Sequence, residues 1–323
     1  MHDKDYDIVI IGSGAGGGVA AKELAPLCAE GKRIAVLEWG AKLKEEEYTG
    51  RENDMASKLF FDSGGTFTKD RSMTLAYGRA YGGSTVIYTG TSLIMPEEVV
   101  EEWSVPGLEF ADLHRRSMRY FEENNVHLLA DDEINDNNRL FLKGCRELGY
   151  HVEQFPINTK GCKGSSLCNL GCPNQAKQGT DRVQLPVAEA QGVEVITNCR
   201  VTKIGDRTCE AMVADPGFGE PSKWEPGEYR VKAKVVVLCA GGVVNSPALL
   251  LRSGYGDELP MLGRSITLHP ALILVGEHEE RITNFHGFPK SYYCDEFMKK
   301  EKFLLEVCMY FPFVTAKNLI GFG

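Results

Sequence analysis

The chain has 323 residues, a length that fits about two domains, and its 43% hydrophobic and 25% charged residues are typical of a globular protein with a sizeable core. The formal net charge of −9 argues against proteins that bind nucleic acid through a basic surface. No basic, apolar leader opens the sequence, and the longest uncharged stretch, Val235 to Leu251, is too short to span a membrane. We therefore expect a cytoplasmic protein whose ten cysteines are thiols or ligands.

The first 40 residues are predicted to fold as a strand, a helix and a second strand. Ile8 to Ile11 is a continuous apolar run, which is typical of a strand buried on both faces, and Ile34 to Leu37 repeats that pattern. Between them, Ala15 to Ala25 has a helical composition, and Pro26 ends the helix because proline cannot continue it. This order is typical of an α/β fold.

A glycine-rich turn joins the first strand to the helix. Its sequence, Gly12-Ser13-Gly14-Ala15-Gly16-Gly17, fits the dinucleotide fingerprint G-x-G-x-x-G. The glycines permit a tight turn, close approach to a pyrophosphate and close helix–strand packing, while the helix N-terminus offers N–H groups to phosphates. Glu38 ends the second strand, where a carboxylate accepts hydrogen bonds from ribose hydroxyls and repels a 2′-phosphate. The turn is therefore predicted to bind FAD or NAD rather than NADP.

The rest of the chain alternates between helical and strand patterns. Residues 41–75 are polar and predicted to be irregular, and residues 156–182 form a loop rich in glycine, cysteine and asparagine. Helices are expected at Pro96–Trp103, Phe110–Asn124 and Asn135–Leu148. Strands are expected at Val193–Thr197, Val201–Ile204, Ala211–Val213 and Tyr229–Leu238. Two later apolar runs are candidates for a second sheet: Ala271–Val275 and Phe303–Phe313.

The segment from Gly78 to Tyr88, GRAYGGSTVIY, is rich in glycine and other small residues. Such residues are needed where a backbone approaches a planar ring or a phosphate, because a Cβ would collide with it. The segment resembles the first signature of the glucose–methanol–choline (GMC) oxidoreductase family, which lies near the flavin. Tyr88 departs from the family pattern, which more commonly has an asparagine with a polar contact to the flavin edge there, and we expect the tyrosine to pack near the ring instead.

The segment from Gly242 to Gly256, GVVNSPALLLRSGYG, is similar to the second GMC signature. It departs at Val243, where a smaller residue is usual, and at Tyr255, where an aliphatic residue is usual. An apolar strand precedes it, so the turn between them is expected to face the cofactor. Ser246 is then expected to cap a helix whose first residue is Pro247.

Three shorter features agree with the resemblance. Asn198 to Val201 lies between two predicted strands, where the family uses the backbone at the valine position to meet the adenine. Gly263-Arg264 followed by Leu268-His269-Pro270 resembles the branch that includes long-chain fatty-alcohol oxidases. The run from Cys168 to Pro173, leading into Ala176-Lys177-Gln178, resembles the same branch. The resemblance covers nearly the whole chain but only the first portion of the family's length.

The resemblance implies an α/β fold with FAD as the cofactor. A Rossmann-like FAD-binding domain, residues 1–95 and 190–265, would be joined to an incomplete α+β substrate domain, residues 96–189 and 266–323. The residues expected to contact FAD are Gly12, Ser13, Gly14, Ala15, Gly16, Gly17, Glu38, Arg79, Gly82, Gly83, Ser84, Tyr88, Val201, Ala240, Gly241, Asn245 and Ser246.

Three cysteines in the loop at residues 156–182 leave two alternatives open. Cys162, Cys168 and Cys172 have the spacing C-x5-C-x3-C-P, which matches a ferredoxin run except that Ser165 replaces the second ligand. Three thiolates are able to hold an iron–sulfur cluster that passes electrons onward from flavin. The alternative is a compact loop that borders the substrate channel, with or without one disulfide, and the family resemblance favours it.

The reaction implied by the resemblance is oxidation of a small-molecule alcohol by hydride transfer to the flavin. The family's catalytic base is a histidine near its C-terminus, in a region that these 323 residues do not reach, so we assign no catalytic residue. His269 is expected to be structural or to line the cavity. Three interpretations follow: a fragment of an alcohol oxidase or dehydrogenase, one subunit of a split enzyme whose partner chain brings the base, or an FAD-binding electron-transfer protein.

Overall fold

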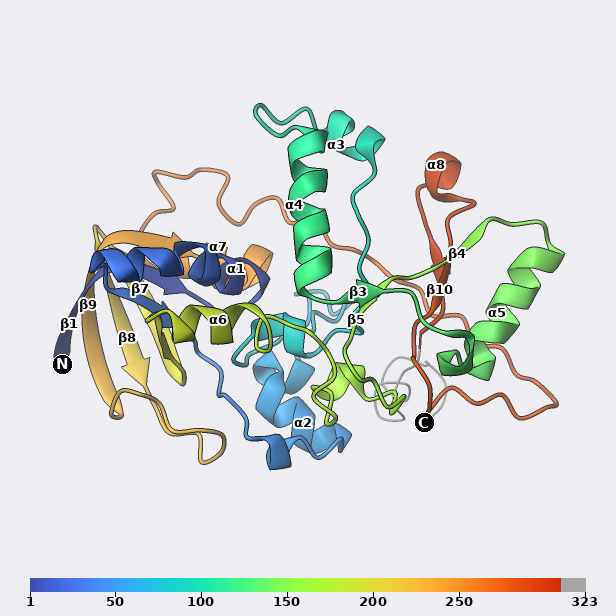
Figure 1. Ribbon diagram of the computed structural model, residues 1–323. Helices are drawn as coiled ribbons and strands as arrows, with labels where there is room; N and C mark the ends of the chain where they lie inside the picture. The colour runs from blue at the N-terminus through green and yellow to red at the C-terminus, as the bar shows by residue number, and fades with distance from the viewer. Residues whose placement is uncertain (309–323) are drawn as a thin grey trace. The chain divides into compact units, whose positions relative to one another are not determined.

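The computed structural model describes residues 1–308 and divides into two compact units. The first unit comprises Met1–Ile87, Asn169–Pro173 and Gly179–Leu274, and the second comprises Tyr88–Cys168, Asn174–Gln178 and the chain from Val275 onward. Helices and strands mix in both, so the predicted α/β class is confirmed (Figure 1). The FAD and substrate domain limits drawn from the sequence stay a prediction.

A six-stranded sheet with the order β6-β2-β1-β9-β8-β7 forms the centre of the first unit. Its strands are β1 (His2–Ile11), β2 (Ile34–Leu37), β6 (Glu194–Ile196), β7 (Cys199–Gly205), β8 (Thr208–Val213) and β9 (Gly227–Leu238). β6, β2, β1 and β9 run parallel, whereas β7, β8 and β9 pair antiparallel as a meander. All six overlap the predicted strands, but β1 begins six residues before the predicted Ile8 and β8 begins three residues before the predicted Ala211.

Helices cover both faces of this sheet because successive side chains of β1 point to opposite sides. Ile8 and Ile10 pack with buried residues of α1 (Ala15–Leu24) and α6 (Gln184–Ala190). Val9 and Ile11 pack in a second cluster with Leu249 of α7 (Gly242–Arg252). The parallel strands are thus buried on both faces, and each fully buried aliphatic side chain contributes about 1.5–3 kcal/mol to stability.

Two helices of the first unit were not predicted. α2 (Glu52–Leu59) lies inside the stretch expected to be irregular, so that prediction was wrong there. Only Met55 and Leu59 of α2 are buried, which leaves a two-turn helix with one apolar contact row among polar residues. α6 follows the cysteine loop and contains a proline at its third position, so its composition gave a weak helical signal.

The second unit has short strands and three of the predicted helices. The helices are α3 (Glu97–Trp103), α4 (Phe110–Glu123), α5 (Asp136–Glu147) and the four-residue α8 (Met298–Glu301). One sheet has the order β11-β10-β4, and β3 pairs with β5; the strands are β3 (Val126–His127), β4 (Val152–Gln154), β5 (Ile157–Asn158), β10 (Tyr292–Cys294) and β11 (Leu305–Glu306). Asn135 caps α5, because its side chain accepts a hydrogen bond from the Asn138 N–H.

The expected second-sheet strand at Ala271–Val275 is not formed. Those residues have no regular structure, and the side chains of Leu272 and Leu274 are 94% and 87% exposed. Only the first part of the other candidate, Phe303–Phe313, is described, and β11 lies within it; the remainder is outside the described residues. No helix within residues 1–308 has the length and apolar character needed to cross a membrane.

Candidate cofactor-binding site

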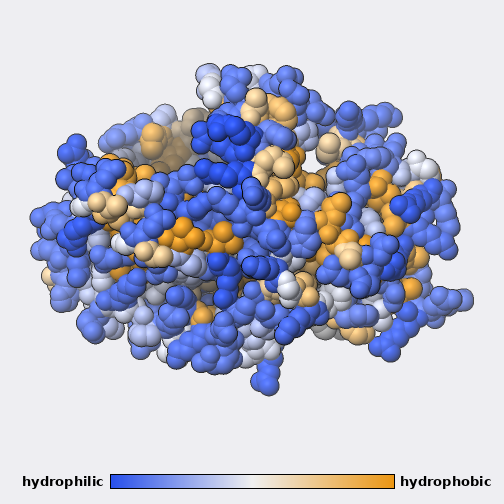
Figure 2. Space-filling view, viewed as in Figure 1, coloured by the Kyte–Doolittle hydropathy of each residue, from blue (hydrophilic) through white to orange (hydrophobic). Residues whose placement is uncertain are grey.

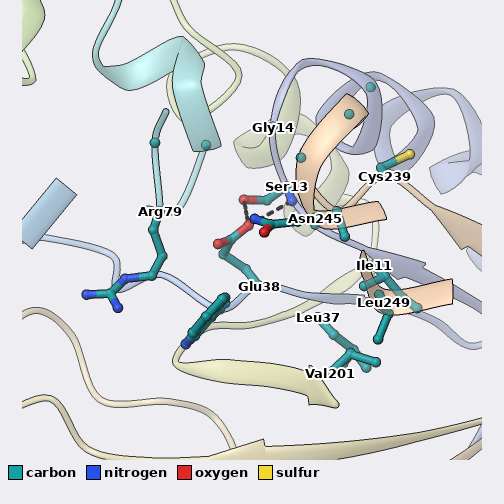
Figure 3. A pocket seen from close by; sticks show the side chains of 18 of the residues that line it. Ile11, Ser13, Gly14, Leu37, Glu38, Arg79, Val201, Cys239, Asn245 and Leu249 are labelled. Carbon is teal, nitrogen blue, oxygen red and sulfur yellow. Dashed lines mark hydrogen bonds between the residues drawn. The ribbon is translucent and has the colours of Figure 1, made fainter. Parts of the chain in front are cut away.

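A cavity of about 400 Å³ lies within the first unit, where β1, β2 and β9 end (Figure 3). Crevices at the carboxyl ends of parallel strands are the usual ligand sites of such sheets. The wall comes from segments far apart in the sequence: Ile11–Gly16, Leu37–Trp39, Tyr77–Arg79, Gly83–Ser84, Cys199–Val201, Cys239–Gly242, Asn245, Leu249 and Arg252.

Most of the residues predicted to contact a cofactor line this one cavity. They are Gly12, Ser13, Gly14, Ala15, Gly16, Glu38, Arg79, Gly83, Ser84, Val201, Ala240, Gly241 and Asn245. Four predicted residues do not line it: Gly17, Gly82, Tyr88 and Ser246. The structure therefore gathers three separated glycine-rich segments at one place, as the sequence reasoning required.

The four remaining residues have other positions. A Cβ on Gly17 would lie 1.8 Å from the Gly12 carbonyl oxygen, so Gly17 lets α1 pack closely against the turn. Gly82 is buried at a turn with φ of +99°. Tyr88 belongs to the second unit, where the Asn158 side-chain amide donates a hydrogen bond to its hydroxyl. Ser246 lies inside α7.

Glu38 and Ser13 form a buried hydrogen-bonded cluster at the centre of the cavity wall. The Ser13 N–H and hydroxyl both donate to Glu38 Oε2, at 2.8 and 2.6 Å, and the Gly40 N–H donates to Oε1 at 2.7 Å. The Gly82 N–H donates in turn to Ser13 Oγ at 2.9 Å. One hydroxyl thus ties the fingerprint turn, the end of β2 and the Gly78–Tyr88 segment together.

The Glu38 carboxylate keeps capacity for one further donor. A carboxylate offers about four lone-pair sites, and the three hydrogen bonds from Ser13 and Gly40 leave one of them on Oε1. Burial raises the pKa of Glu38, although these hydrogen bonds and the Arg79 charge act in the opposite direction. Glu38 therefore holds the glycine-rich turn in place through three hydrogen bonds. A ribose hydroxyl would donate a fourth hydrogen bond to the same carboxylate.

Gly83 is required for a reason that the sequence did not indicate. Its φ is +56°, and a Cβ there would lie 2.7 Å from the Cα of Gly14. The two glycine-rich segments therefore touch backbone to backbone, and the close approach is between them rather than only toward a ligand. A Cβ on Gly14, by contrast, would meet nothing closer than Gly83 Cα at 3.9 Å.

The start of α7 differs from the prediction. The helix begins at Gly242 after the N-cap Gly241, whose φ is +90°, so Ser246 is not the cap and Pro247 lies inside the helix. Gly241 adopts a left-handed backbone conformation, which glycine tolerates and serine does not readily adopt. As a result, the N-termini of α1 and α7 both line the cavity, and neither carries an acidic residue in its first turn. Two helix N-termini favour a bound anion.

Several lining residues were missed by sequence reasoning. Trp39 directly follows Glu38, and the guanidinium carbons of Arg200 and Arg79 lie 4.4 and 5.7 Å from the centroid of its ring. Two cysteines also face the cavity, and burial raises the pKa of the Cys199 and Cys239 thiols, so neither supplies a thiolate at neutral pH. Of these residues, only Trp39 had a position in the sequence that could have identified it, because it directly follows Glu38 at the end of a predicted strand.

The cysteine loop and His269 contribute nothing to this cavity. Cys162 and Cys168 pack in an apolar cluster of the second unit, and Cys172 belongs to the first unit. Within residues 1–308, no three His, Cys, Asp or Glu side chains are grouped to hold a metal ion, and the two alternatives for the cysteine loop stay predictions. His269 is exposed in a segment without regular structure and does not line this cavity, so the expectation that it is structural or lines the substrate cavity stays a prediction.

Comparison with known proteins identifies a family. Residues 7–271 match the model of the GMC oxidoreductase N-terminal domain. The chain is 31% identical to an uncharacterised GMC-type oxidoreductase of Mycobacterium tuberculosis (strain H37Rv) over 98% of its own length and 50% of that protein. It is 30% identical to a long-chain-alcohol oxidase of Arabidopsis thaliana, covering 87% of this chain and 38% of the oxidase. The chain thus spans about half or less of the length of these curated relatives.

A solved structure shows the same fold. Pyridoxine 4-oxidase from Mesorbium loti superposes with a TM-score of 0.55 at 19% sequence identity. The match covers 80% of this chain and 54% of the oxidase. The likeness supports the α/β fold assignment.

Proposed function

Because the chain belongs to the GMC oxidoreductase family, we propose that its first unit binds FAD in the cavity at the ends of β1, β2 and β9 and serves the oxidation of an alcohol. The observation that carries the proposal is the meeting of two helix N-termini with Glu38 at one cavity. A diphosphate needs donors and positive potential, and a ribose needs an acceptor; this wall provides both.

The residues present fit the adenosine diphosphate half of FAD. The N-termini of α1 and α7 present free N–H groups, and the open space beside Gly14 leaves room for a diphosphate against the backbone. The lone pair left on Glu38 Oε1 suits a ribose hydroxyl. Val201 lies at the wall beside Arg200, and its backbone is our candidate for the adenine contact.

A bound FAD would supply the flavin ring that accepts the hydride from the alcohol carbon. This chain's own part is to fix the adenosine end through main-chain donors, which would hold the ring at a set distance from the site of reaction. Among residues 1–308 we assign no residue the role of the base that removes the hydroxyl proton. We propose that the base lies in sequence outside these residues, either in the same polypeptide or in a partner chain.

An open strand edge and exposed apolar side chains support the proposal that further sequence or a partner chain brings the base. β9 pairs with β1 as far as Leu238, but β8 follows it only to Lys232, so the last part of β9 has one open edge among the described strands. Val235 on that edge is 51% exposed, and Val243 of α7 is 58% exposed. Figure 2 shows apolar residues reaching the surface between hydrophilic ones on the face it draws. An open strand edge is able to pair with a further strand, from the same polypeptide or from a partner chain.

Titration of the purified chain with FAD, NAD and NADP tests the cofactor assignment. We expect quenching of flavin fluorescence at a ratio of one FAD per chain and no comparable binding of NADP, with circular dichroism showing that the chain is folded. Anaerobic flavin bleaching with long-chain and cyclic alcohols then tests the base. We expect no bleaching by the chain alone, because a positioned base typically supplies about 10²–10⁴-fold in rate. Rapid bleaching that is lost in His269→Ala would make His269 the base and contradict the proposal.

A further inference from the structure

A second cavity of about 280 Å³ lies beside the first, within the same unit. The two share the wall formed by Trp39, Arg79 and Arg200, and the second adds Lys58 and Asn198 together with apolar residues of β8 and the loop after it. We call it the cationic cavity, because three of its lining residues are cations and none is an aspartate or glutamate. This local cluster of positive charge is opposite in sign to the net charge of the chain, which is −9.

The two arginines have no carboxylate partner. Within residues 1–308, neither Arg79 nor Arg200 forms an ion pair, and both lie over the ring of Trp39. In Figure 3 the Arg79 side chain extends away from Ser13 and Glu38, so its charge acts on Glu38 only from a distance. Lys58 differs, because it pairs with Asp54 at 3.1 Å. Two guanidiniums that form no ion pair and lie over one aromatic ring have donors left for an anion.

Asn198 gives an independent indication of a ligand. It is 7% exposed and lines the cationic cavity, yet its side-chain amide has no hydrogen-bond partner among the residues that the structure describes. Its backbone is held at φ of +56°, where its N–H donates to the Gly40 carbonyl at 3.1 Å and its own carbonyl accepts from the Ala214 N–H at 3.2 Å. The amide is therefore open to the cavity, and non-glycine residues held at positive φ carry backbone strain and cluster at ligand sites.

We propose that the cationic cavity binds a small organic phosphate, at a site separate from the cofactor. Arginine forks match the oxygens of a phosphate, and the surplus positive charge of two guanidiniums suits a dianion better than a single carboxylate. The Asn198 amide would donate to a phosphate oxygen. Phe218 and Trp39 give the organic part an apolar wall, and the volume admits a phosphomonoester but not a dinucleotide. The site goes beyond the proposed oxidation and does not depend on it.

The test is calorimetric titration of the full 323-residue chain with inorganic phosphate at constant ionic strength, with and without saturating FAD. We expect one phosphate per chain in both conditions and weaker binding of acetate. Asn198→Asp places a carboxylate of the same shape in the cavity, and aspartate tolerates positive φ, so we expect phosphate affinity to fall at least about tenfold. Lys58→Gln, which touches only this cavity, should lower it by about threefold or more.

Lys143→Gln is the matched control, since Lys143 forms an i,i+4 ion pair with Glu147 on α5 as Lys58 does with Asp54 on α2. It should leave phosphate binding unchanged. The proposal is overturned if the parent chain takes up no phosphate, if acetate binds equally well, or if both cavity variants keep the parent affinity. Loss of phosphate binding on saturation with FAD would also overturn it, because the cavity would then belong to the cofactor site. Failure of FAD to bind would leave the phosphate result standing by itself.

Discussion

The two sides of the cofactor cavity are built in different ways. On one side, the fingerprint turn, Gly83 and the start of α7 present main-chain atoms, packed so closely that a Cβ has no room at several positions. On the other side, Trp39, Arg79 and Arg200 present long side chains held by stacking. The main-chain side is therefore expected to tolerate almost no change of shape, whereas substitutions on the side-chain side are expected to change FAD binding little.

The sharpest way to break this comparison is Gly83→Val. The new side chain would meet Gly14 Cα and would have to adopt a left-handed φ, so we expect a loss of at least about 2–4 kcal/mol of stability and no measurable FAD binding. Flavin absorbance after reconstitution and urea unfolding measure the two effects. Gly144→Val is the control, because a Cβ on Gly144 has no neighbour within 4 Å. Normal FAD binding by Gly83→Val would contradict the contact between the two glycine segments.

Glu38→Ala tests the buried cluster that supports the main-chain side. It removes the acceptor of three hydrogen bonds and the candidate ribose contact, and we expect FAD to bind more weakly by about 1–3 kcal/mol. Ser13→Ala removes only the bridging hydroxyl and should cost less. A side-by-side fluorescence titration of both variants ranks them. If Glu38→Ala holds FAD as tightly as the parent chain, then neither the buried cluster of Glu38 and Ser13 nor the ribose contact has the role described.

Glu38→Gln separates charge from shape in the same cluster. Burial raises the folded-state pKa of Glu38, so its contribution to stability is fully present below the unfolded pKa of about 4.3 and is lost as the pH rises through the folded value. The amide does not titrate, and the variant should therefore lack this fall. Urea unfolding of both proteins from acid to neutral pH measures it. If the free energies of unfolding of the two proteins change with pH in parallel, then the pKa of Glu38 is not raised in the folded chain.

The smallest effect is expected on the side-chain side. Arg200 is exposed, and its charge is screened, so Arg200→Gln should change FAD affinity by less than about threefold at physiological salt. The same variant should abolish most of the phosphate binding described above. A fall in FAD affinity as large as that of Glu38→Ala would show that the two sides of the cavity do not differ in the way described.

The same contrast explains what the sequence was able to predict. The fingerprint turn, the strands and Glu38 were predictable because their signals are local, with a continuous apolar run, fixed glycine spacing and an acid at a strand end. α2 was missed because two buried residues make no clear period, and the cap of α7 was misplaced because a serine–proline pair is a common helix start. The segment Asn198 to Val201 was singled out only for the backbone of Val201, because the grouping of Arg200 and Asn198 with Trp39 depends on tertiary structure.

The hydroxyl of Ser13 has a consequence for how the protein acquires its site. Its hydrogen bond from the Gly82 N–H joins residues 69 positions apart, so the loop between them must close before the turn takes its final shape. The entropy of closing a loop grows only slowly with its length, but contacts distant in sequence form late in folding. Cofactor capture should therefore follow formation of the parallel sheet, and FAD present during refolding should slow unfolding while leaving the refolding rate of the sheet unaltered.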